Sequence, residues 1–240
     1  MSQPLRVVVL GEGKDERGTH RTLAPFTPVP HEEQGAMEIL VRRALYPLLN
    51  DGQPWHRGLT RHDGIQILQP PVPRLPRAPS MVEVLANPNM LAPLISAAVK
   101  PVRGPAPADL LVATHDADGA GPAIEAVRVV SSSLDTHVPL LLPAPEIQAW
   151  LARKRAIELA YGREHCSVPE PDEESLKQDA KAELQRLLGT FGGKFNARMQ
   201  AGLAEHVSAE DLARYDWSGW NQATEILQEA LAIRLLSAPP

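Results

Sequence analysis

Hydrophobic and polar positions along the chain follow two patterns in turn, and these predict strands and helices. Four short, mostly apolar runs have the pattern of buried parallel strands, and they lie at 6–11, 64–69, 109–115 and 138–142. Helices are predicted between them, at 34–50, 81–99 and 122–133. Strands that alternate with helices predict an α/β fold, with a parallel sheet flanked by helices.

The last part of the chain carries helical patterns alone. A helix entered through Pro145 should follow the fourth strand, and further helices are predicted at 173–188, 194–206, 209–215 and 221–237. Two stretches, 17–34 and the proline-dense 70–80, look like inserts or linkers. We therefore predict an α/β domain over residues 1–165 and a C-terminal helical lobe, 166–240, packed on it.

Composition narrows the class of protein. Of the 240 residues 43% are hydrophobic and 22% charged, which is enough for a sizeable core. Without an apolar run of eighteen residues or a secretory pattern at the start, a membrane span and export are not expected, and a bacterial cytoplasm is the expected compartment. The single cysteine, Cys166, excludes an internal disulfide and cysteine-rich zinc sites. A net charge of −5 argues against a stand-alone DNA-binding protein, but not against a subunit that receives DNA from a partner.

Acidic residues stand directly after two of the predicted strands. Glu12 follows the first strand, and Asp116 and Asp118 follow the third. Ligands of open parallel sheets bind beyond the carboxyl ends of the strands. If these strands are neighbours, the three carboxylates converge, and such a cluster calls for a hard cation. Oxygen ligands favour Mg²⁺ or Mn²⁺ over zinc. Glu16, four residues after Glu12, could turn back toward the same site, and Glu146, after the fourth strand, could reach it from the neighbouring loop.

Other motifs fit the first turn poorly. The stretch from Gly11 to Glu16 has two glycines of a dinucleotide fingerprint, but Glu16 takes the place of the third. Lys14 is followed by Asp15, whereas the phosphate loop of NTPases requires Ser or Thr there. Aspartate-nucleophile phosphatases carry Asp-x-Asp after their first strand, whereas in this chain it follows the third. No nucleophile elbow supports a Ser–His–Asp hydrolase.

A strand ending in Glu12-Gly13, followed about a hundred residues later by a strand ending in Asp116-Ala-Asp118-Gly, resembles the TOPRIM fold. Within that family the form Glu-Gly-x-x-Glu is closest to the overcoming-lysogenization-defect (OLD) nucleases and their small uncharacterised relatives encoded near ATPases. The segment Glu146-Ile-Gln-Ala-Trp-Leu151 and the lysine-containing helix at 177–188 resemble segments of those relatives. The insert at 17–34 and the linker at 70–80 depart from the family pattern.

The resemblance implies a Mg²⁺- or Mn²⁺-dependent endonuclease, the effector subunit of an ATPase-coupled, antiviral system. Glu12, Asp116, Asp118 and Glu16 would hold metal, with Glu16 or Glu146 completing a second metal site or acting as general base. A lysine would stabilise charge on the phosphate, with Lys181 and Lys154 ahead of Lys14. The implied partners are nucleic acid, DNA favoured over RNA, and an ATPase, with no membrane; a homo-oligomer stays open.

Structural roles compete with each of these assignments. Asp and Gly are good turn formers, and an acid at a helix start favours the helix dipole. Trp150 and Leu151 fit a core better than a substrate contact, and His115, beside the acids, fits a ligand and a strand-end histidine that faces away from them equally well. Two other functions also stay open. One is a non-catalytic TOPRIM-like subunit that binds or regulates a partner, and the other is phosphoryl or nucleotidyl transfer to a small molecule.

Overall fold

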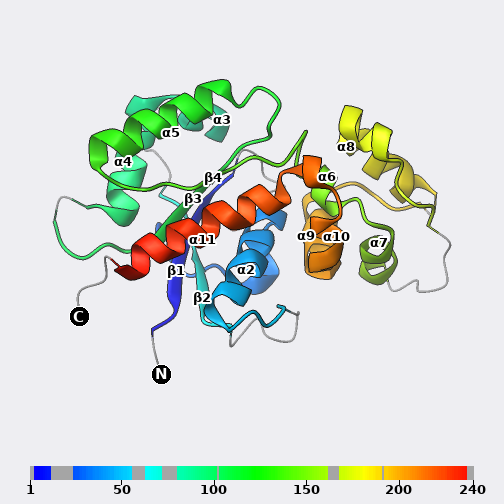
Figure 1. Cartoon of the computed structure of the whole chain (residues 1–240), viewed down its shortest axis with the longest axis horizontal. Helices are drawn as coiled ribbons and strands as arrows, with labels where there is room; N and C mark the ends of the chain where they lie inside the picture. The colour runs from blue at the N-terminus through cyan, green and yellow to red at the C-terminus, as the bar shows by residue number, and fades with distance from the viewer. Residues whose placement is uncertain are drawn as a thin grey trace.

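The computed structural model describes residues 3–11, 24–55, 63–71, 80–101, 103–161, 168–190 and 192–236. Its centre is a four-stranded, all-parallel sheet in the order β2-β1-β3-β4 (Figure 1). The strands are β1 (Leu5–Leu10), β2 (Ile65–Leu68), β3 (Leu110–Thr114) and β4 (Leu140–Leu141). This confirms the predicted α/β fold and places each strand within two residues of the apolar run that predicted it.

The register of the strands decides which loops meet. On one side of β1, Leu5 pairs with Ile65 of β2, and on the other side Leu10 pairs with Ala113 of β3. β4 then pairs with the outer side of β3. The carboxyl ends of β1, β3 and β4 therefore lie next to one another, which is the arrangement that the acid pattern required.

Helices cover both faces of the sheet. Because side chains alternate along a strand, Val7 and Val9 of β1 enter one hydrophobic cluster and Val8 and Leu10 enter the other. One face is covered by α3 (Met81–Leu85), α4 (Pro88–Val99) and α5 (Gly121–Leu134). The opposite face is covered chiefly by α2 (Ala36–Leu49) and α11 (Trp220–Leu236), and α11 crosses the sheet in red in Figure 1.

The segment predicted as one helix over 81–99 forms two. Ser80 caps α3 as expected, since its Oγ accepts from the N–H of Glu83 at 3.2 Å while the Glu83 carboxylate accepts from the N–H of Ser80 at 2.7 Å. Pro88 begins α4, where its missing N–H costs nothing, so the interruption falls there. Pro93, by contrast, lies inside α4 without ending it.

A mostly helical region follows the sheet. After the short α6 (Gln148–Leu151) come α7 (Lys154–Ala160), α8 (Glu173–Gly189), α9 (Ala197–His206) and α10 (Ala209–Ala213), and a 3-10 turn at Asp216–Ser218 precedes α11. Another 3-10 turn, at His31–Glu33, precedes α2. α9 packs on α2 and α7, and α6 packs on α8. The chain then returns to the sheet as α11, which contacts α2 and β4. The division into domains at residue 165 stays a prediction.

The turn before α11 is fixed against the exit of β4. Trp150 is fully buried, donates from Nε1 to the carbonyl of Ser218 at 2.6 Å, and meets Trp220 edge-on at 5.1 Å. Gly219 has φ +80°, and a Cβ there would lie 2.6 Å from the carbonyl oxygen of Leu142, so this close approach requires glycine. Trp150 and Leu151 are thus core residues, as interpreted from the sequence.

The described part of the insert covers the open edge of β2. Val29 donates to the carbonyl of Ile67 at 2.9 Å, and Gln69 donates to Thr27 at 2.8 Å, around an antiparallel bridge between Pro28 and Leu68. A paired edge is protected from pairing with other chains. Among the described helices, none combines the length and apolar character that crossing a bilayer requires.

Candidate functional site

The loop after β3 carries two of the predicted acids and is held by backbone hydrogen bonds to the segment after β4. His115 donates to Leu141 at 3.1 Å, Ala117 to Pro143 at 2.9 Å, and Asp118 to Pro145 at 3.4 Å. The pairing of the two strands thus continues beyond their ends. The acids of this loop are therefore held on a rigid support at the carboxyl edge of the sheet.

Asp116 and Asp118 occupy different environments on this loop. Asp116 is partly buried, and its Oδ1 accepts from the backbone N–H of Ile147 at 3.1 Å. Asp118 is exposed. Between strand and acids, the buried His115 donates from Nδ1 to the carbonyl of Asp116 at 2.7 Å, which fixes its ring. The bond from Ile147 connects the acid loop directly to the residue after Glu146.

Glu146 reaches a helix 35 positions further along the chain. Its Oε1 accepts from the backbone N–H of Lys181 at 2.7 Å, inside α8. α8 is broken there, because Asp179 has non-helical angles (φ −156°, ψ 84°) and its Oδ1 accepts from the N–H of Ala182 at 2.8 Å. The single helix predicted over 173–188 is therefore wrong at this point. Asp179 caps the second half, and Glu146 satisfies another of its free N–H groups.

The environment of Glu146 raises the pKa of its carboxyl. Burial raises the pKa of its carboxyl above the ordinary value of 4.5, and the negative charge of Asp179 acts in the same direction. The N–H and the ammonium of Lys181 oppose this rise without cancelling it. A carboxyl with a raised pKa is better matched to accepting a proton at neutral pH than an ordinary glutamate.

The lysines differ in the groups that their ammonium groups contact. The backbone N–H of Lys181 donates to the carboxylate of Glu146, and its ammonium lies 5.6 Å from the centre of the Phe195 ring. Lys154 instead pairs with Glu170 at 3.7 Å. Lys177 pairs with Glu173 and Glu174 at 3.0 Å each, as a lysine on a solvated helix face does. Of the two candidate lysines that the structure describes, Lys181 is the one whose backbone contacts Glu146.

Glu12, Lys14 and Glu16 lie outside the described residues. Gly11, the last residue described before them, is buried and follows β1, the neighbour of β3. Within the described ranges, no group of three or more His, Cys, Asp or Glu side chains could hold a metal ion. Asp116 and Asp118 supply carboxylate oxygens, and one or two carboxylates with water and substrate oxygens are a usual Mg²⁺ environment. The donor set fits the predicted cation, and its completion by Glu12 stays a prediction.

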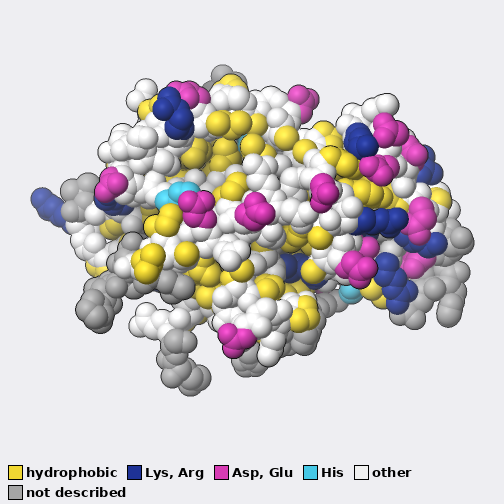
Figure 2. Space-filling model, in the orientation of Figure 1, with side chains coloured by type: hydrophobic (Ala, Val, Ile, Leu, Met, Phe, Trp, Pro, Cys, Tyr) yellow, Lys and Arg dark blue, Asp and Glu magenta, His cyan; other side chains and the backbone are white. Residues whose placement is uncertain are grey.

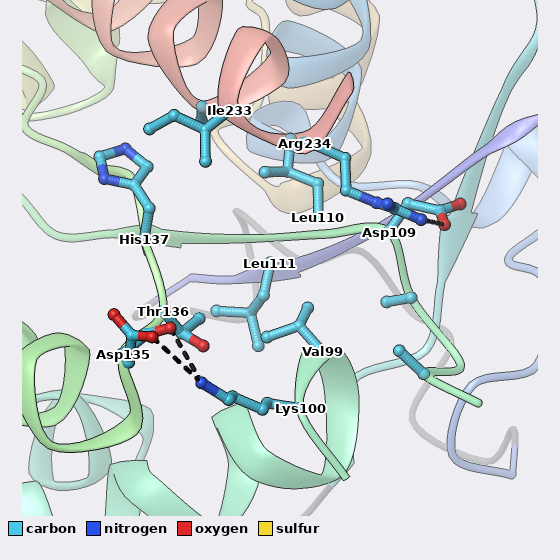
Figure 3. A pocket seen from close by; sticks show the side chains of 13 residues that line it. Val99, Lys100, Asp109, Leu110, Leu111, Asp135, Thr136, His137, Ile233 and Arg234 are labelled. Carbon is cyan, nitrogen blue, oxygen red and sulfur yellow. Dashed lines mark hydrogen bonds and ion pairs between the residues drawn. The ribbon is translucent and has the colours of Figure 1, made fainter. Parts of the chain in front are cut away.

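A separate cavity lies at the opposite edge of the sheet (Figure 3). It has a volume of about 360 Å³ and is lined by residues around Asp109, which precedes β3, and His137, which precedes β4. Its charges are already paired. Asp109 accepts from Arg6 at 3.1 Å and from Arg234 at 2.9 Å, bonds that hold its pKa below the ordinary value although burial opposes this. Lys100 donates to the carbonyl of Asp135 at 3.0 Å, at the end of α5.

Replacing Glu146 with glutamine should remove a pH-dependent loss of stability. A raised pKa means that the folded protein holds this proton more tightly than the unfolded chain. The resulting stabilisation is present below pH 4.5 and is lost as pH rises through the folded pKa. The stability of the wild type should therefore fall relative to that of Glu146→Gln as the pH rises above 4.5. Urea unfolding at several pH values measures this difference.

The control for this comparison is Glu229→Gln, on the exposed face of α11. Both variants lose one carboxylate, so general effects of net charge cancel between them. In Glu146→Gln the amide oxygen can still accept from Lys181, so the contact with α8 is kept. Parallel pH profiles for the two variants would show that Glu146 has no raised pKa.

No family model matches the chain, and searches of curated proteins and of solved structures find no similar protein. The fold is therefore known from its own geometry, as a four-stranded parallel sheet in the order 2-1-3-4 with helices on both faces.

Proposed function

We propose that this chain is a metal-dependent nuclease that hydrolyses phosphodiester bonds of DNA or RNA with Mg²⁺ or Mn²⁺. The observation that carries the proposal is the adjacency of β1 and β3. Glu12 directly follows Gly11 at the exit of β1, and Asp116 and Asp118 follow β3 at the same edge. The TOPRIM-like order of these motifs supports nucleic acid as the substrate.

Each residue has a role that follows from its chemistry. Asp116 and Asp118, with Glu12 and Glu16, would hold the cation through carboxylate oxygens. The cation, when bound, polarises a phosphoryl oxygen and lowers the pKa of the attacking water. Glu146 would accept the proton of that water with Oε2, since Oε1 already accepts from Lys181. The ammonium of Lys181 would stabilise negative charge on the phosphate.

The proposed biological setting is an effector subunit of an ATPase-coupled, antiviral system in the cytoplasm. A net charge of −5 gives the chain little long-range attraction for DNA. A partner that delivers the nucleic acid, such as an ATPase, removes this obstacle. DNA is the favoured substrate, as in the family that the motifs resemble.

A second candidate is a non-catalytic subunit that binds or regulates a partner. One observation favours it, because two of the acids already have structural roles. Asp116 accepts from Ile147, and Glu146 accepts from Lys181, so both carboxylates hold backbone segments in place. These structural contacts are enough to account for Asp116 and Glu146 in a protein that has no substrate.

The deciding experiment is a cleavage assay on the purified full-length chain. Single- and double-stranded DNA and RNA are each incubated with Mg²⁺, Mn²⁺ or Ca²⁺, or with EDTA, and products are separated on denaturing gels. A nuclease should give new fragments with Mn²⁺ or Mg²⁺ and none with EDTA. Intact substrates under every metal condition would contradict the nuclease and favour the partner-binding subunit.

A further inference from the structure

A second cavity, unrelated to the acid loop, lies in the helical region between α7, α10 and the segment before α8. Its volume is about 260 Å³, and its lining is mainly polar. Lys and Arg side chains gather with Asp and Glu over α7 and α10 in Figure 2. The cavity itself is lined by four cationic residues, Arg153, Lys154, Arg155 and Arg214, and by three acids, Glu158, Glu170 and Asp211.

The acids of this cavity are already engaged. Glu170 pairs with Lys154, and Glu158 pairs with Arg155, each at 3.7 Å. The carboxylate of Asp211 accepts from the hydroxyl of Ser208 at 2.8 Å. Within the described part of the chain this leaves two guanidinium groups, those of Arg153 and Arg214, without a carboxylate partner.

Arg153 is held rigidly, with one donor left over. The residue is only 2% exposed, and its side chain donates from Nε to the carbonyl of Asp211 at 2.9 Å and from Nη1 to Ala152 at 3.0 Å. Its guanidinium also lies over the ring of Tyr215, 4.6 Å from the centre. Its Nη2, also buried, has no hydrogen-bond partner among the described residues. A buried charged donor without a partner is costly, and such a group calls for a ligand.

Arg214 brings a second positive charge to the same place. Its guanidinium stands 5.6 Å from the centre of the Tyr215 ring that Arg153 also contacts. Burial lowers the pKa of Arg153 to about 10, although Tyr215 and Asp211 act against this, and the nearby charge of Arg214 lowers it further. The charge of Arg214 also acts on the carboxylate of Glu173, but that carboxylate forms an ion pair with Lys177 and accepts from the indole of Trp217. Asp211 acts on Arg153 from the same cavity, but neither guanidinium forms an ion pair with a described carboxylate, and adjacent guanidinium groups are typical of sites that bind phosphate.

We propose that this cavity is a phosphate-binding site, with Arg153 and Arg214 as its main donors. The ligand is a phosphate group, either free or at the end of a nucleotide. The volume is below the roughly 300–1,000 Å³ of pockets for drug-sized molecules, which fits one phosphate with a small substituent. The cavity of Figure 3 differs, because there Asp109 already neutralises Arg234. The proposal is independent of the nuclease, because it uses none of the acids of the loop after β3.

Calorimetric titration of the full-length chain with inorganic phosphate, in a chloride buffer, tests the site. The wild type should bind saturably, and Arg214→Gln should weaken binding by about tenfold, the usual effect of losing one charge-assisted hydrogen bond. Arg214 is exposed, so this variant should fold, and circular dichroism checks that it does. Arg198→Gln, an exposed change on α9 that does not line the cavity, should bind as the wild type does. Absence of saturable binding, or equal affinity in Arg214→Gln, would overturn the proposal.

Two further titrations identify the source of the phosphate. A dinucleotide with a 5′-phosphate and the same dinucleotide without it are compared with inorganic phosphate. Tighter binding of the phosphorylated dinucleotide, lost in Arg214→Gln, identifies a nucleic-acid end as the ligand. Affinity equal to that of inorganic phosphate identifies the free anion. If inorganic phosphate binds and neither dinucleotide does, the ligand is again the free anion, whereas equal, saturable binding of both dinucleotides would contradict a site for a terminal phosphate.

Discussion

Replacing Asp63 with alanine should lower the free energy of unfolding by about 3–5 kcal/mol, because it removes one partner of a buried ion pair. Arg42 donates from Nη1 to Asp63 at 2.6 Å, and the two side chains are only 4% and 2% exposed. In the variant a guanidinium stays buried without this carboxylate. Urea unfolding followed by circular dichroism measures the loss.

The size of this effect also reflects the other contacts of Asp63. The same carboxylate accepts from the indole of Trp55 at 3.3 Å and from the N–H of Ile65, the first residue of β2, at 3.0 Å. Asp63 thus joins α2, through Arg42, to the start of β2. Its removal leaves these buried donors without their acceptor, and each adds to the cost.

The chain contains a matched control for burial. Arg128 and Glu125 form an ion pair of the same length, 2.6 Å, but their side chains are 67% and 59% exposed on α5. Glu125→Ala should therefore cost far less than Asp63→Ala, because water screens an exposed ion pair. High salt should reduce the effect of Glu125→Ala further and leave that of Asp63→Ala nearly unchanged. Similar losses in the two variants would show that burial does not determine the strength of the Arg42–Asp63 pair.

Local patterns predicted most of the fold, and long-range contacts account for the corrections. The apolar runs at 6–11 and 109–115 have the length and pattern of buried strands, and they pair side by side. The break in α8 was missed because apolar residues continue at helical spacing through Leu176, Ala180 and Leu184. Asp is a good N-cap residue, but this signal is hidden inside a periodic pattern. Glu146 reaches that break from 35 positions away, and no local pattern encodes the contact.

In the candidate site, too, the sequence predicted the positions of residues along the chain but not their long-range contacts. The strand-end rule correctly placed Asp116 and Asp118 in the loop after β3, beside the exit of β1. The bond from Ile147 to the carboxylate of Asp116 depends on how two loops approach each other, so the sequence could not predict it. Arg153 was also missed, because a single arginine between two helices has no signature until Tyr215 and Asp211 fold against it.

Replacing Asp116 with asparagine should reduce metal-dependent cleavage at least about 100-fold, if the proposed nuclease is correct. Asparagine keeps an oxygen that can accept from Ile147, so the loop after β3 should stay in place. What is lost is the negative charge that holds the cation, and a metal ion contributes several kcal/mol to such reactions. The measurement is kcat/KM with Mn²⁺, together with Mn²⁺ binding by calorimetry.

The control for Asp116→Asn is Asp135→Asn, the same chemical change at the opposite edge of the sheet. Asp135 is exposed and has φ 48°, a conformation that asparagine also adopts readily, so neither fold nor cleavage should change. Cleavage and Mn²⁺ affinity that stay at wild-type levels in a folded Asp116→Asn would remove Asp116 from the metal site. If Asp116→Asn loses cleavage and Mn²⁺ binding but keeps the melting temperature of the wild type, Asp116 binds the metal. Its structural role would not explain the loss, because the bond from Ile147 is present in the wild type and in the variant.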